Sequence, residues 1–109
     1  MKLNDYQTRS RETAVYPGQT SIDGLTYSVL ALCGETGELA NKLKKTLRSG
    51  EVPNVPALRD ELGDVLWYVA SVAHELGATL EEVANENLEK LRLRNTEKSI
   101  AVPIGGYHD

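Results

Sequence analysis

The stretch that decides the fold is residues 22–48, IDGLTYSVLALCGETGELANKLKKTLR. Mostly apolar residues recur in it at spacings of three and four, which is the period of an α-helix with one buried face. The repeating positions are Leu25, Val29, Leu32, Thr36, Leu39, Leu43 and Leu47. Positive residues crowd the last two turns, where the negative end of the helix dipole favours them. Gly50 follows as a C-cap, so one helix is predicted from about Ile22 to Arg48.

Two more helices are predicted next to this segment. The first runs over about residues 4–14, with Asn4 and Gln7 resembling a capping box, and ends before the break at Pro17-Gly18. A proline-containing loop is expected over residues 51–56. After it, a second apolar stripe of helical period predicts a helix from about Ala57 to Leu76.

The last predicted helix begins at a clear capping signal. Thr79 and Glu82 form a capping box, and the helix continues to about Lys98. No segment alternates with period two, so no sheet is expected. The fold class is therefore all-α and four-helix-bundle-like, with one domain over residues 1–100 and an irregular tail over residues 101–109.

Composition limits the kinds of partner. The chain has 109 residues and a net charge of −4, whereas nucleic-acid-binding domains usually present a basic face. Its single cysteine, Cys33, has apolar helical neighbours and suggests a core thiol in a reducing compartment. We see no signal peptide and no apolar run long enough to cross a membrane. A cytoplasmic protein with no nucleic-acid or membrane partner is expected.

Two pairs of acids carry the chemistry. Glu35 and Glu38 are three residues apart on one predicted helix, and Glu61 and Asp64 are three apart on another, so each pair faces one way. At about 100° per residue, Glu35 falls about 40° from the stripe position Leu39, and the second pair borders its own stripe similarly. Four carboxylates brought together at such an edge would repel one another. A hard cation with oxygen ligands, usually Mg²⁺, removes that repulsion. A solvated acidic face is the alternative interpretation of any single pair.

The last helix carries polar groups on its apolar side. Asn87 and Arg94 fall on that side and Lys90 borders it. Buried polar groups need partners. These three residues would either form an internal salt-bridge network with the acids or hold phosphates from the opposite side of the metal. Both interpretations are equally open.

Three segments together resemble a known family. GETGEL (34–39), ELGDVLWY (61–68) and NLEKLRLR (87–94) are similar to the MazG-like nucleotide pyrophosphohydrolases of the all-α NTP pyrophosphatase superfamily, over about residues 22–95. The resemblance implies a MazG-type helical bundle that oligomerises through helix packing, as a dimer or tetramer. It implies an acid anhydride hydrolase that cleaves NTP or dNTP to the nucleoside monophosphate and pyrophosphate.

The resemblance also assigns roles to residues. The four acids, Glu35, Glu38, Glu61 and Asp64, become ligands of Mg²⁺, with Mn²⁺ as a substitute. A metal-activated water attacks phosphorus, and Glu38 accepts its proton. Substrate contacts fall to the residues Asn87, Lys90, Arg94 and Tyr68.

Other interpretations compete with the enzyme. Trp67 lies nearly opposite the stripe of its helix, so a packing or subunit contact is favoured there over a platform for the base. A di-iron bundle would need E-x-x-H motifs, which the chain lacks. The main alternative is a non-catalytic helical interaction module with a solvated acidic face.

Overall fold

The structure is a computed structural model that describes residues 1–101, with side chains described for residues 1–97. Its elements are α1 (Leu3–Ser10), a 3₁₀ turn η1 (Arg11–Thr13), α2 (Ile22–Ser49), α3 (Val55–Glu75) and α4 (Leu80–Ala101). No strand occurs among these residues, so the all-α fold class is confirmed. Ala101, predicted to start the tail, ends α4, and the rest of that predicted tail lies outside the described residues. None of the described helices is long and apolar enough to span a membrane.

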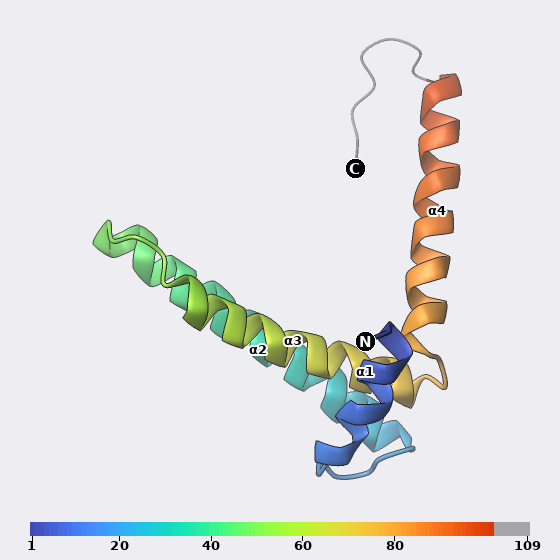
Figure 1. Ribbon diagram of the computed structural model, residues 1–109, viewed down its shortest axis with the longest axis horizontal. Helices are drawn as coiled ribbons and strands as arrows, with labels where there is room; N and C mark the ends of the chain where they lie inside the picture. Colours follow the sequence, from blue (N-terminus) through green and yellow to red (C-terminus); the bar gives the residue numbers. More distant parts are fainter. Residues whose placement is uncertain (102–109) are drawn as a thin grey trace.

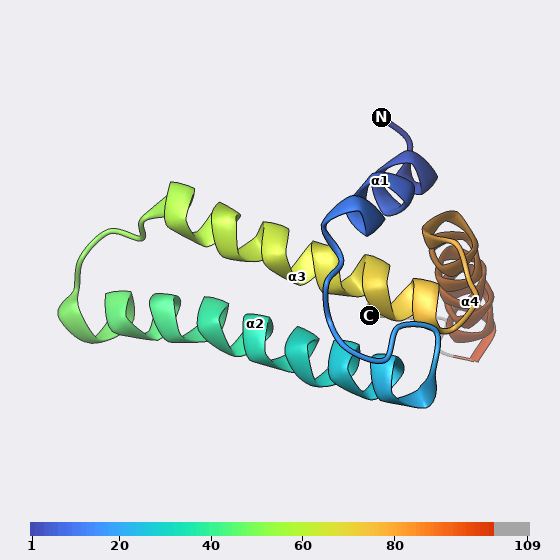
Figure 2. The same cartoon turned by 90° about the horizontal axis from the view of Figure 1, so that it is seen from below.

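The long helices α2 and α3 lie side by side and antiparallel (Figures 1 and 2). The predicted cap of α2 is confirmed, because Gly50 has φ +75° and its N–H donates to the carbonyl of Thr46. The loop predicted over residues 51–56 is shorter than expected, since α3 begins at Val55 after the N-cap Asn54. Pro56 fits the first turn of α3 because N–H groups there have no helical partner to lose.

The capping box predicted for the first helix is wrong. Asn4 and Gln7 instead cap α4, more than 70 residues away: the N–H of Glu81 donates to Asn4 Oδ1 at 3.0 Å, and that of Leu80 donates to Gln7 Oε1 at 2.9 Å. The Gln7 amide also donates to the carbonyl of Ala78 at 3.0 Å. Because the first N–H groups of a helix lack partners within it, α1 fixes the corner between α3 and α4.

The predicted start of α4 is confirmed at the local level. The N–H of Thr79 donates to Glu82 Oε1 at 2.9 Å, and the N–H of Glu82 donates to Thr79 Oγ1 at 3.1 Å. Beyond its first turns, α4 leads away from α2 and α3 (Figure 1), so the four helices do not close into a bundle within one chain. The radius of gyration is 17.6 Å, against about 13 Å for a compact domain of this size.

The core of the single chain is small. Among residues 1–97, the buried apolar residues are Tyr16, Ala70, Ala73 and Leu80. The prediction that Cys33 is a core thiol is wrong, because this residue is exposed on α2. Large apolar side chains remain exposed on all three long helices, among them Leu43 (50% exposed), Leu62 (55%) and Leu88 (64%). Exposed apolar surface of this extent is typical of interaction surfaces.

The role of Gln7 gives a first prediction. Gln7→Ala removes the partners of the Leu80 N–H and the Ala78 carbonyl at a buried position, so it should lower the free energy of unfolding by about 2 kcal/mol. Urea unfolding followed by circular dichroism measures this loss. Thr8→Ala, on the exposed side of the same helix, is the control and should change stability little. Equal stabilities for the two variants would show that α1 does not hold the corner.

Candidate metal centre

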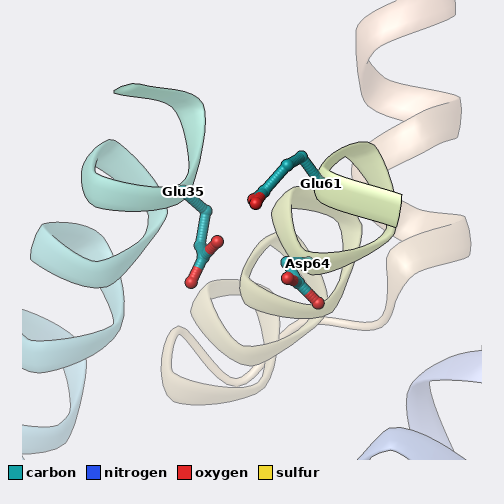
Figure 3. Close-up of side chains that lie close together, drawn as sticks. All are labelled: Glu35, Glu61 and Asp64. Carbon is teal, nitrogen blue, oxygen red and sulfur yellow. The ribbon is translucent and has the colours of Figure 1, made fainter. Parts of the chain in front are cut away.

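The antiparallel pairing of α2 and α3 brings acids from both helices together. One carboxylate oxygen each of Glu35, Glu61 and Asp64 lies within 4.8 Å of the other two, and Figure 3 shows the side chains converging between the helices. The fourth predicted ligand, Glu38, is exposed one turn further along α2 and is not part of this group. We call Glu35, Glu61 and Asp64 the acidic cluster.

The cluster is electrostatically strained in the absence of a cation. Desolvation raises the pKa of Glu35, and the nearby charges of Asp64, Glu61 and Glu38 raise that pKa further. The side chain of Glu61 is only 12% exposed. Its Oε2 atom is buried and has no hydrogen-bond partner among the described residues. A buried, unpartnered carboxylate oxygen is costly, so the donor set fits a hard divalent cation.

Lys42, which is not among the predicted site residues, partly neutralises the cluster. Lys42 Nζ lies 2.9 Å from Glu61 Oε1, and this hydrogen bond, together with nearby acidic charges, raises the pKa of Lys42. From the sequence alone, the lysines at the end of this helix are expected to interact with the helix dipole. The spacing indicates a different role. Lys42 follows Glu38 by four residues and Glu35 by seven, which places all three on one side of α2, near the acids.

The predicted contact residue Tyr68 lies beside the cluster. A cavity of about 380 Å³ is lined by Thr13, Glu35, Asp64, Trp67 and Tyr68. Trp67, for which a packing or subunit contact was predicted, packs its ring edge-on against Tyr16 and Tyr68 and also lines this cavity. Thr13 was not predicted as a lining residue, because η1 reaches α3 only through the tertiary fold.

The remaining predicted contacts lie on α4. Asn87, Lys90 and Arg94 are exposed, on the part of the helix that leads away from α2 and α3 (Figure 1). At 1.5 Å per residue, Lys90 and Asp64 are each roughly 15 Å from the α3–α4 corner along diverging helices. The structure of one chain therefore does not bring Lys90 to the acidic cluster, and Lys42 is the cation found there.

Comparisons with known proteins identify the family of the chain. The family described as the MazG nucleotide pyrophosphohydrolase domain matches residues 25–98. The chain is 45% identical to the Gene 37 protein of Mycobacterium phage L5, over 86% of this chain and 89% of the phage protein. No solved structure matches. The matched region contains the acidic cluster, Lys42 and most of α4, and the chain belongs to the MazG nucleotide pyrophosphohydrolase family.

Proposed function

We propose that the chain is a Mg²⁺-dependent pyrophosphohydrolase that converts NTP or dNTP to the nucleoside monophosphate and pyrophosphate. The observation that carries this proposal is the acidic cluster, in a chain of a nucleotide pyrophosphohydrolase family. Within the described part of the chain, the buried Oε2 atom of Glu61 has no hydrogen-bond partner. A non-catalytic interaction module would gain nothing from three carboxylates within 4.8 Å, because their repulsion costs stability.

In the proposed reaction the acids and Lys42 have separate roles. Glu35, Glu61 and Asp64 hold the ion, for which Mn²⁺ can substitute because it accepts the same oxygen ligands. When bound, the ion supplies positive charge to the phosphates and lowers the pKa of a water molecule. Glu38, at the exposed edge of the site, accepts the proton of the attacking water. The water oxygen bonds to the α-phosphorus, the bridging bond to the β-phosphate breaks, and pyrophosphate leaves. Lys42 balances part of the charge of Glu61.

The direct test is a panel of NTPs and dNTPs with Mg²⁺, Mn²⁺ or excess EDTA, with the products resolved. We expect monophosphate plus pyrophosphate, and no turnover in EDTA. Asp64→Asn should lower kcat/KM by more than the roughly 10–100-fold lost on removing outer-shell partners of a metal. Asp60→Asn is the matched control, since it makes the same charge change at an exposed position of the same helix. Full turnover in EDTA, or in Asp64→Asn, would refute the proposed function.

The raised pKa of Glu35 predicts opposite effects of one substitution with and without metal. Folding disfavours the ionised form of Glu35. The residue therefore costs no stability below its ordinary pKa of 4.5, where it is protonated in the folded and the unfolded chain. The cost develops as the pH rises from 4.5 through the raised pKa of the folded state. In EDTA, Glu35→Gln should therefore raise Tm at pH 7 and have little effect near pH 4. With Mg²⁺ at pH 7 the wild type should instead have a higher Tm than Glu35→Gln, because the wild type gains stability from binding the ion. A wild-type Tm that does not change when Mg²⁺ is added would contradict the metal site.

We also propose a homo-oligomer, a dimer or tetramer, in which α4 of one copy covers the acidic cluster of another. Asn87, Lys90 and Arg94 would then contact the phosphates or the sugar. This arrangement is supported by the position of these residues on a diverging helix and by the exposed apolar surface around Leu62 and Leu88. A second copy would cover that surface.

Mixing two variants tests this arrangement. Lys90→Ala and Asp64→Asn should each be nearly inactive. When unfolded and refolded together in equal amounts, they should recover about a quarter of wild-type activity, because half of the dimers are mixed and each holds one intact site. Each variant refolded alone is the control. A mixture no more active than its components, or light scattering that shows only a 12.0 kDa monomer at micromolar concentration, would refute the shared site.

A further inference from the structure

The two carboxylate oxygens of Glu61 have different surroundings. Its Oε1 atom accepts a hydrogen bond from Lys42 Nζ at 2.9 Å. Its Oε2 atom is buried and has no hydrogen-bond partner within residues 1–97. The side chain is only 12% exposed, so little water reaches it. Lys42 therefore satisfies only half of a nearly buried carboxylate.

Lys42 is much less enclosed than Glu61. Its side chain is 39% exposed, and it lines a cavity of about 190 Å³ formed by residues of α2 and the start of α3. A lysine ammonium is a compact, strongly hydrated charge on a flexible stem, so it can leave a carboxylate for water at modest cost. Glu61 has no such freedom. The ion pair can therefore open only by movement of the lysine.

A divalent ion in the acidic cluster needs the same carboxylate as Lys42. Mg²⁺ binds its oxygen ligands at about 2.0–2.1 Å, and the Lys42 ammonium lies 2.9 Å from an oxygen of one of the three ligands. Two cations on one carboxylate repel each other in proportion to the product of their charges. The ion therefore binds either against the charge of Lys42 or after displacing it.

We propose that Lys42 competes with the divalent ion for Glu61 and thereby sets the metal affinity of the acidic cluster. Lys42 acts through Glu61, as a positioning residue, and is not itself a ligand. Its charge should make the site respond to Mg²⁺ at a higher concentration than the three carboxylates would by themselves. The inference rests on the proposed function for the use of the ion, and it adds the residue that controls how readily the ion is bound.

Binding of Mn²⁺ to the full chain measures this competition, because free Mn²⁺ can be quantified by its electron paramagnetic resonance signal. Lys42→Met removes the charge and should lower the dissociation constant of Mn²⁺ roughly tenfold, the order expected for a unit charge beside a divalent ion in water-like surroundings. Lys42→Arg keeps the charge and should leave that constant close to the wild-type value. Lys45→Met is the matched control, since it removes the same charge from an exposed position on α2, where solvent screens it.

Thermal unfolding separates competition from a purely structural role. In EDTA, Lys42→Met should have a lower Tm than the wild type, because it leaves the charge of Glu61 unpaired. The same concentration of Mn²⁺ should then raise the Tm of Lys42→Met by more than that of the wild type, since tighter binding stabilises the folded state more. A purely structural lysine would lower Tm equally with and without the ion. Lys42→Gln keeps a hydrogen-bond donor without the charge and replaces Lys42→Met if that variant does not fold.

The outcomes distinguish this inference from the proposed function. Mn²⁺ affinity that is unchanged or weaker in Lys42→Met and Lys42→Gln, or an equal gain in Lys45→Met, would overturn the inference, and Mg²⁺-dependent cleavage of nucleotides would still support the proposed function. Tighter Mn²⁺ binding by Lys42→Met, in a protein that cleaves no nucleotide, would support the inference and refute the proposed function. Failure of every variant and of the wild type to bind Mn²⁺ would refute both.

Discussion

Repulsion among three carboxylates is the constraint on which the site depends. Glu35 comes from α2, whereas Glu61 and Asp64 come from α3, so their approach to within 4.8 Å is imposed by the packing of two helices. A surface cluster could relax by moving its side chains into water. Glu61 cannot, because its side chain is 12% exposed and one of its oxygens is buried without a partner among the side chains of residues 1–97. The pairing of α2 and α3 therefore creates a place that a divalent cation stabilises.

The N-terminal segment supports this site from outside the helix pair. Gln7 ties α1 to the start of α4, and Arg11 ties η1 to α3 through Ser71. Thr13 then reaches the indole of Trp67. The same short segment thus sets the direction of α4 and forms one wall of the cavity beside the acids. These contacts are polar and directional, and they fix positions more narrowly than apolar packing alone would.

The sequence predicted those features whose causes are local. Apolar period and end signals placed α2 within about one residue, since Gly50 adopts the positive φ that a helix end favours. The Thr79–Glu82 box joins residues three apart and was equally readable. Asn4 and Gln7 were misjudged because their true partners are 77 and 73 residues away. The same i, i+3 spacing fits a local cap, and nothing in the sequence distinguishes the two uses.

The sequence by itself determined that the chain forms four helices and that two of them carry acid pairs beside their apolar stripes, because helical period alone sets which residues share a side. Only the tertiary structure decided that Glu35, Glu61 and Asp64 converge while Glu38 stays exposed, that Lys42 pairs with Glu61, and that Thr13 meets Trp67. The relative rotation of packed helices and the path of a connecting segment fix those contacts. The rotation and the path depend on contacts between side chains far apart in the chain. A local sequence pattern carries no information about such contacts.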